Sequence, residues 1–178
     1  GVGFGSSGNS PNPVAPKKRI LVVDDNVVFL KAMSFQLRDC GYEVLTAVDG
    51  ASAVNTVRRL IPDLILLDLG MPGISGIDLI SRIRLHRIPT PILVLTMRNE
   101  ALAARRALGA GANGYLTKDN EPEVLLAAIR KTAAGNRLIV LMISRHSEAS
   151  SCSGLSTGMA TTVVQFGLAT MPFGMRSR

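Results

Sequence analysis

The sequence has no tryptophan and only two cysteines among its 178 residues. Cys40 and Cys152 are too few for a disulfide framework, and no CxxC motif or Cys/His cluster offers a zinc site. His86 and His146 are isolated, and we expect both to be surface residues. The N-terminus lacks a basic region followed by an apolar segment, so no secretory signal is predicted. These absences favour a reducing, cytoplasmic setting.

Charge is missing from one long stretch and nearly balanced in another. Residues 149–175 carry no charge, but Ser, Thr, Gln, Gly and Pro interrupt them throughout, so no membrane helix is expected. The formal net charge is +7, yet residues 19–137 hold 15 Lys or Arg against 12 Asp or Glu, a net of +3. A domain-wide nucleic-acid surface is therefore not supported.

Three regions differ in composition. Residues 1–17, rich in Gly, Ser, Asn and Pro, predict a flexible N-terminal arm because they have few large apolar groups. Residues 18–137 alternate short Val/Ile/Leu runs with longer segments of helical spacing, which predicts repeated βα units and a parallel sheet. Residues 138–178 lack such a pattern and are expected to form an irregular tail.

Strand and helix limits follow from local signals. The expected strands are 19–24, 42–47, 63–68, 91–96 and 113–117, and the second, the least apolar, is expected at an edge. Helices are expected to begin after the capping residues Asn26, Asp49, Asn99 and Asn120, the last with Glu123 in a capping box, and three of them to end at Gly41, Gly109 and Gly135.

Polar side chains lie at the carboxyl ends of four of the expected strands or directly after them. They are Asp24 with Asp25, Asp68, Thr96 and Lys118. The carboxyl ends of parallel strands meet at one edge of such a sheet, where ligands bind. A single strand-end aspartate is better explained as a helix cap, but four polar strand ends together indicate a site.

These residue types suit magnesium-assisted phosphoryl chemistry. Mg²⁺ prefers oxygen ligands, which Asp25, Asp68 and the backbone carbonyl of Gly70 can supply, while Asp24 orients a metal-bound water. A carboxylate can attack phosphorus when nearby positive charge neutralises the transferring group. Asp68 is the predicted nucleophile, with the Lys118 ammonium and the Thr96 hydroxyl contacting phosphoryl oxygens.

Four segments resemble the receiver domain of bacterial two-component response regulators. They are LVVDDN (21–26), LILLDLGMPGISGIDLI (64–80), PILVLT (91–96) and GANGYLTKD (111–119), and residues 111–135 further resemble the NarL/FixJ-type branch. The expected fold is a flavodoxin-like, doubly wound (βα)5 three-layer sandwich with strand order 2-1-3-4-5.

The resemblance implies roles for particular residues. Asp68 would accept phosphate from a sensor histidine kinase, and Asp24 and Asp25 would build the Mg²⁺ site. Thr96 and Tyr115 would form a two-position switch, Thr96 moving toward the phosphoryl group and Tyr115 filling the vacated space.

The sequence departs from the family pattern after two of the strands. Asp119 follows Lys118 where many receivers have proline, and Met97 follows Thr96 where a smaller residue is common. The first change affects the expected backbone geometry of the loop at Lys118. The second, a larger side chain, would restrict the access of water or of a phosphodonor to Asp68. Arg98, Arg105 and Arg106 mark either a solvated face or a homodimer or effector surface around the fourth and fifth helices.

The usual output of the NarL/FixJ branch is a C-terminal helix-turn-helix domain, whose pattern residues 138–178 do not show. Either the chain is a stand-alone receiver, or it is a truncated or frame-shifted remnant of a DNA-binding transcriptional regulator. The loss of pattern after Arg137 favours the remnant. DNA would be a partner only with the missing domain restored.

Three other functions fit less well. A haloacid-dehalogenase-type phosphatase needs a second Asp two residues after Asp68, where this chain has Gly70. A flavodoxin-like mononucleotide binder would have a Gly/Ser/Thr-rich loop after the first strand, in place of acidic Asp24 and Asp25. A pseudo-receiver would lack the acceptor or metal residues, and none is lost. The expected class is a phosphoacceptor signalling module rather than an enzyme acting on an outside substrate.

Overall fold

The computed structural model describes residues 16–97, 101–135, 138–140 and 163–164. Strands and helices alternate along most of the chain, as the sequence pattern predicts. The elements are β1 (Arg19–Val23), α1 (Val27–Asp39), β2 (Glu43–Ala47), α2 (Gly50–Leu60), β3 (Leu64–Asp68), α3 (Gly76–Leu85), β4 (Ile92–Thr96), α4 (Ala101–Ala110), β5 (Gly114–Thr117), α5 (Pro122–Ala133), β6 (Leu138–Val140) and β7 (Val163–Val164).

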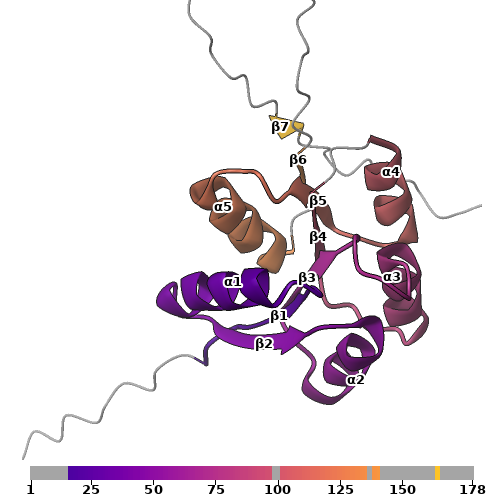
Figure 1. Ribbon diagram of the computed structural model, residues 1–178, viewed down its shortest axis with the longest axis horizontal. Coiled ribbons are helices and arrows are strands. Elements are labelled where there is room, and N and C mark those ends of the chain that lie inside the picture. The colour runs from indigo at the N-terminus through magenta and orange to yellow at the C-terminus, as the bar shows by residue number, and fades with distance from the viewer. Residues whose placement is uncertain (1–15, 98–100, 136–137, 141–162, 165–178) are drawn as a thin grey trace, which may run out of the picture.

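A central sheet separates two layers of helices (Figure 1). Strands β1 to β5 are parallel in the order β2-β1-β3-β4-β5, which confirms the predicted 2-1-3-4-5 order. Helices α1 and α5 cover one face of the sheet, and α2, α3 and α4 cover the other (Figure 1). This is the doubly wound three-layer architecture expected from the sequence.

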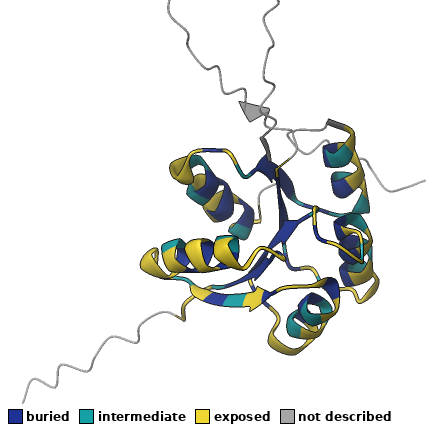
Figure 2. Ribbon diagram, in the orientation of Figure 1, coloured by how far each residue is buried: buried dark blue, intermediate teal, exposed yellow. Residues whose placement is uncertain are grey.

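Alternating strand residues build two cores, one on each side of the sheet (Figure 2). Leu21, Ile65 and Val94 belong to the core under α2, α3 and α4. Val22 and Leu66 belong to the core under α1 and α5. Each fully buried aliphatic side chain stabilises the fold by roughly 1.5–3 kcal/mol. Every residue of β3 and β4 is buried, because both strands lie between two covered faces.

Strand β2 lies at the edge of the sheet, as predicted. Glu43 and Thr46 are exposed there, whereas Val44 and Ala47 pack inward. This mixed composition explains why its sequence signal is weaker than that of the central strands. At the other edge, β6 pairs parallel to β5 and β7 pairs antiparallel to β6.

Several predicted helix ends are confirmed. Asn26 caps α1 by accepting hydrogen bonds from the backbone N–H groups of Val28 and Phe29 at 3.0 and 3.2 Å. Asp49 caps α2 by accepting from the N–H of Ser52 at 2.7 Å. Gly41 and Gly135 follow α1 and α5 with positive φ angles, which glycine adopts without a Cβ clash.

Two predicted helix ends are wrong. Asn120 does not cap α5, because its side chain is buried and donates to the carbonyl and hydroxyl oxygens of Thr117, both at 2.8 Å. Glu121 occupies the cap position without a side-chain hydrogen bond, so no capping box forms. Gly109 lies inside α4, and Gly111, with φ of +112°, follows the helix.

Parts of the other expectations fall outside the described residues. These are the N-terminal arm up to residue 15, Asn99, Arg98, His146 and most of the C-terminal tail. Strands β6 and β7 lie within the segment for which the sequence predicted an irregular tail. In the described part of the chain, none of the helices is long and apolar enough to cross a membrane.

Candidate functional site

The parallel register brings Asp24 and Asp68 to the same edge of the sheet. Val23 aligns with Leu67 in the β1–β3 pair, so each aspartate comes directly after an aligned position. One carboxylate oxygen from each of Asp24, Asp25 and Asp68 lies within 4.8 Å of the others. The predicted cluster of three carboxylates is therefore assembled by the strand pairing itself.

The three aspartates differ in exposure. Asp24 and Asp68 are 1% and 7% exposed, whereas Asp25 is exposed to solvent. Oδ1 of Asp24 also accepts a hydrogen bond from the backbone N–H of Asn26 at 2.9 Å. Buried carboxylates must be paired or must coordinate a cation, because isolated burial of a charge is very costly. The site therefore needs positive charge.

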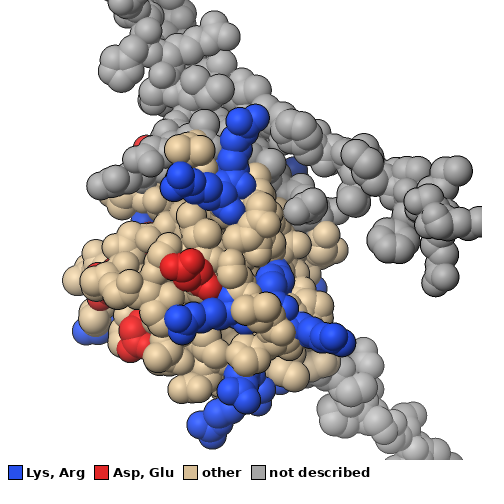
Figure 3. Space-filling view, turned by 90° about the vertical axis from the view of Figure 1, so that its right-hand side faces the viewer, with Lys and Arg blue, Asp and Glu red and all other residues tan. Residues whose placement is uncertain are grey.

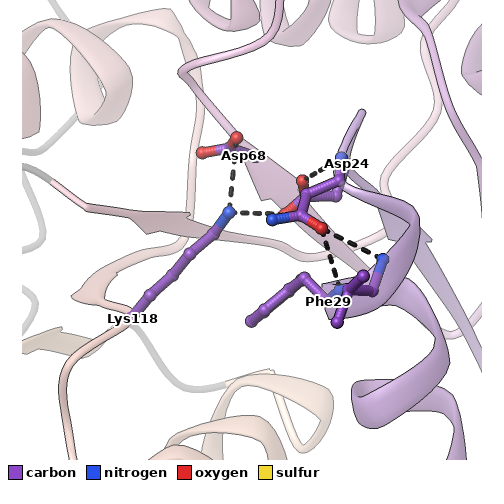
Figure 4. A network of polar contacts seen from close by, with 6 residues as sticks. Asp24, Phe29, Asp68 and Lys118 are labelled. Atoms are coloured by element: carbon purple, nitrogen blue, oxygen red, sulfur yellow. Dashed lines mark hydrogen bonds and ion pairs between the residues drawn. The ribbon is translucent and has the colours of Figure 1, made fainter.

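Lys118 supplies part of that charge (Figure 4). Its Nζ lies 2.5 Å from Oδ2 of Asp24 and 3.3 Å from Oδ2 of Asp68. The Lys118 side chain is only 8% exposed. Its backbone N–H donates to the carbonyl of Thr96 at 2.8 Å, which ties the end of β5 to the end of β4. The ammonium thus bridges the two buried carboxylates.

Phe29 is a member of the site that the sequence did not suggest. Nζ of Lys118 lies 4.4 Å from the centroid of its ring. Phe29 is at the third position of α1, where the Asn26 cap holds its backbone N–H. Its place in the first helical turn after Asp24 and Asp25 was the only available signal, and a phenylalanine there is equally explained by packing.

Thr96 and Tyr115 lie on neighbouring strands close to this edge. Thr96 ends β4 and is 5% exposed, and it is one residue beyond Leu95, the partner of Asp68 in the β3–β4 pair. Tyr115 is fully buried in the core beneath α4 and pairs with Val94. The alternative of an ordinary strand tyrosine with an exposed hydroxyl does not apply, since the side chain is 0% exposed.

Two glycines allow the chain to pass close to Asp68. A Cβ added to Gly70 would lie 3.4 Å from Oδ2 of Asp68, so the Gly70 backbone is adjacent to the carboxylate. A Cβ on Gly76 would lie 2.7 Å from Cδ2 of Leu69 and 3.0 Å from the carbonyl oxygen of Asp68. The backbone of the loop after β3 therefore packs directly against the site. A side chain at Gly76 would fit only if the neighbouring Leu69 moved.

The structure describes both positions at which the sequence departs from the family pattern, Asp119 and Met97. The described residues contain no cis peptide bond, so the bond between Lys118 and Asp119 is trans. Met97 is 74% exposed.

Arg105 and Arg106 are exposed on α4. Figure 3 shows the face formed by α2, α3 and α4, where Lys and Arg side chains outnumber Asp and Glu.

The donor set fits a magnesium ion. Within the described part of the chain, three carboxylates lie close together and one ammonium group contacts two of them. The remaining negative charge and the oxygen ligands match the preferences of a hard divalent cation. The arrangement can therefore hold a cation beside a buried carboxylate and an ammonium group.

Comparisons with known proteins agree with this geometry. Residues 20–130 match the response regulator receiver domain family. The chain is 38% identical over 136 residues to the nitrate/nitrite response regulator protein NarP of Escherichia coli, covering 75% of this chain and 63% of that protein. It is 37% identical over 117 residues to the transcriptional regulatory protein KdpE of Mycobacterium tuberculosis, covering 66% and 51%. The chain thus spans about half to two thirds of the length of these curated relatives.

Solved structures show the same fold. The chemotaxis protein CheY4 of Vibrio cholerae superposes with a TM-score of 0.63 at 32% identity, covering 66% of this chain and 99% of that one. A LuxR-family two-component response regulator from Aurantimonas superposes with a TM-score of 0.66 at 34% identity, covering 71% and 91%. Fold, carboxylate cluster and family match agree, and the chain belongs to the response regulator receiver domains of two-component signalling systems.

Proposed function

We propose that the chain takes up a phosphoryl group on Asp68 as its signalling input. The observation that carries the proposal is the position of the Asp68 carboxylate. It is 7% exposed, 3.3 Å from the Lys118 ammonium and within 4.8 Å of the Asp24 and Asp25 carboxylates. A buried carboxylate beside both an ammonium group and a cation-binding cluster is arranged to attack phosphorus.

The proposed ligands of Mg²⁺ are Asp24, Asp25, Asp68 and the Gly70 carbonyl, with Asp24 acting through water. When bound, the ion neutralises the oxygens of the transferring group and orients it. Receiver domains form a signalling family rather than an enzyme family. Self-phosphorylation and self-dephosphorylation at Asp68 are the only covalent steps that we propose for this chain.

In self-phosphorylation, a carboxylate oxygen of Asp68 forms a bond to phosphorus, and the bond from phosphorus to the donor breaks. The electron pair of the broken bond stays with the leaving group. The leaving group is the histidine imidazole when the donor is phosphohistidine, and an acetate ion when the donor is acetyl phosphate. The Lys118 ammonium and the Thr96 hydroxyl donate hydrogen bonds to the transferred oxygens. The ammonium also offsets part of the negative charge that would otherwise accumulate beside Asp24 and Asp25.

The physiological donor that we propose is a sensor histidine kinase. Histidine kinases phosphorylate response regulator receiver domains, and this chain belongs to that family. The partner's imidazole would approach over the same edge of the sheet, where Asp25 is exposed and Asp68 is not. The resemblance to NarP supports placing the chain in the NarL/FixJ-type branch.

The proposed readout is a switch at Thr96 and Tyr115. A phosphoryl group adds about 1.5–2 negative charges and strong acceptors at Asp68, which would draw the Thr96 hydroxyl toward the site. Tyr115 lies on β5 and is buried in the core beneath α4, so a change in the position of its ring would alter how α4 packs. The homodimer or effector surface that we propose is accordingly the one formed by α4 and α5.

The output that we propose is transcription regulation, because one relative is named as the transcriptional regulatory protein KdpE and another as the DNA-binding response regulator MtrA. Direct DNA binding would require a helix-turn-helix domain. Residues 136–137, 141–162 and 165–178 lie outside the described part of the chain. The proposed limits of the receiver domain are therefore those of the sequence pattern, residues 18–137.

One experiment tests the phosphoryl acceptor. The protein is incubated with MgCl₂ and acetyl phosphate, and its intact mass is measured with and without EDTA. We expect one phosphoryl adduct that depends on Mg²⁺, is absent in Asp68→Asn and is retained in Asp78→Asn, a matched control at an exposed position on α3. An adduct that persists in Asp68→Asn, or no adduct at any Mg²⁺ concentration, would contradict the proposal.

A further inference from the structure

The ring of Phe29 faces the ammonium group on which the proposed chemistry depends. The distance of 4.4 Å from Nζ of Lys118 to the ring centroid lies within the range of about 6 Å for cation–π attraction. The Lys118 side chain is 8% exposed, and Phe29 is half-buried. Such attractions are stronger where water is excluded, so this contact is better placed than a surface one.

The backbone of Phe29 is held firmly enough for the ring to act as a support. Asn26 caps α1 and accepts hydrogen bonds from the N–H groups of Val28 and Phe29. The next residue, Leu30, is buried in the core beneath α1. Phe29 therefore sits on a helical turn that is fixed by a cap on one side and by core packing on the other.

Among the described residues, three partners of the Lys118 side chain act on it from different elements. Asp24 follows β1, Asp68 ends β3 and Phe29 lies on α1, as Figure 4 shows. Carboxylates attract the ammonium over a range of positions, and a lysine side chain has several rotatable bonds with a considerable rotamer entropy. A fixed ring restricts those positions, so less conformational freedom is lost when the ammonium engages a transferring phosphoryl group.

We infer that Phe29 is a positioning residue, whose ring holds the Lys118 ammonium between Asp24 and Asp68. This inference rests on the proposed function at Asp68. The ring touches neither the phosphoryl group nor the metal in this scheme, and it acts only through Lys118. What matters is an aromatic face at position 29, not apolar bulk.

The first test compares aromatic and aliphatic side chains at position 29. Initial rates of phosphorylation are measured by intact mass at saturating Mg²⁺ and acetyl phosphate. We expect Phe29→Leu to lower the rate about three- to tenfold and Phe29→Tyr to stay within about twofold of the parent, since tyrosine also offers a cation–π face. Equal rates for the Leu and parent proteins would overturn the inference, and so would an equal loss in both variants.

The second test does not depend on phosphorylation. In NMR spectra of protein with isotope-labelled lysine, the Lys118 CH₂ group bonded to Nζ should show an upfield ring-current shift, with the signal identified by its loss in Lys118→Met. We expect the shift to disappear in Phe29→Leu and to persist in Phe29→Tyr. An unshifted signal in the parent would overturn the inference.

The two tests separate the two claims. A parent protein that takes up no phosphate refutes the proposed function, and the placement of Lys118 by Phe29 is then decided by the ring-current shift alone. A parent that is phosphorylated on Asp68, together with a Phe29→Leu variant that is equally fast, leaves the proposed function intact and refutes the positioning role.

Discussion

Replacing Lys118 with methionine should destabilise the cation-free protein and make its stability more dependent on Mg²⁺. The Lys118 ammonium contacts Asp24 at 2.5 Å and Asp68 at 3.3 Å, and the two carboxylate side chains are 1% and 9% exposed. Methionine keeps the approximate length and the apolar stem of lysine. The substitution therefore removes mainly the charge, which leaves two buried carboxylates close together.

The size of the effect follows from these contacts. Removing one partner of a buried ion pair costs about 3–5 kcal/mol. The remaining repulsion between Asp24 and Asp68 is of the same order, roughly 3.5 kcal/mol for oxygens at 4.8 Å with an effective dielectric constant of about 20. Water can reach the exposed Asp25 beside them and reduces both figures. We expect the free energy of unfolding to fall by about 3 kcal/mol.

Magnesium should restore more stability to the variant than it adds to the parent. A ligand present at about 100 times its dissociation constant stabilises the folded state by about 2.7 kcal/mol. In the parent, Lys118 already occupies Oδ2 of Asp24, whereas in Lys118→Met that oxygen is available to the ion or its water shell. The increment in unfolding free energy on adding Mg²⁺ should therefore be larger in the variant.

The assay is urea unfolding followed by circular dichroism, in EDTA and in MgCl₂. Lys131→Met is the matched control, because Lys131 is an exposed lysine near the end of α5. The reasoning would be refuted if Lys118→Met were as stable as Lys131→Met in EDTA. An equal Mg²⁺ increment in the parent and in Lys118→Met would refute the idea that the lysine and the ion share Asp24.

Three further substitutions test how the fold supports the site. Arg84→Met should lower the unfolding free energy by about 2–4 kcal/mol in urea titrations, because the guanidinium donates five hydrogen bonds, two of them to the Gly111 carbonyl; a loss below about 1 kcal/mol would contradict this. Gly76→Ala should cost about 1–3 kcal/mol by the same measurement and slow phosphorylation, since the new Cβ would meet the Leu69 backbone at 2.9 Å; an unchanged midpoint would contradict this. The Ser52 backbone N–H holds the pKa of Asp49 below its usual value, so the cap stabilises α2 at neutral pH and is lost as the pH falls below about 4; urea midpoints of Asp49→Ala and the parent should converge in acid, and a constant difference would exclude the cap as the cause.

The strands could be predicted closely from the sequence because their signals are local and mutually consistent. The apolar run that ends at Asp68 predicts a strand over 63–68, and β3 spans Leu64–Asp68. Unbroken apolar composition also predicts burial on both faces, which holds for every residue of β3 and β4. Once the strands are parallel, Asp24, Asp68 and Thr96 must come to the same edge.

The start of α5 shows why helix ends are harder to predict. Asn120 has the composition of a cap, and its spacing to Glu123 matches a capping box. In the structure Pro122 begins the helix, and the buried Asn120 side chain bonds back to Thr117. Two local solutions satisfy the same short sequence, and tertiary burial of Asn120 selects the one that the sequence pattern does not favour.

Side-chain direction is the other feature that spacing does not determine. The sequence predicts that Lys118 approaches a phosphoryl group on Asp68, and it assigns no role to Phe29. The structure shows that the ammonium is closer to Asp24 than to Asp68 and lies against the Phe29 ring. These contacts join residues that are far apart in the sequence, and they depend on how α1 is positioned relative to β5.

The contacts of Asp24 bear on how the three aspartates divide the work of binding a cation. Oδ1 of Asp24 accepts the Asn26 N–H, and Oδ2 accepts the Lys118 ammonium, so both oxygens are already engaged. Direct ligation through Oδ2 would bring a divalent cation next to the Lys118 ammonium, and direct ligation through Oδ1 would compete with the Asn26 N–H for that oxygen. The exposed Asp25 faces neither conflict, and Asp68 has a single ionic partner at 3.3 Å among the described contacts. We therefore expect Asp25 and Asp68 to ligate Mg²⁺ directly, and Asp24 to act through a bound water while it holds Lys118 in place.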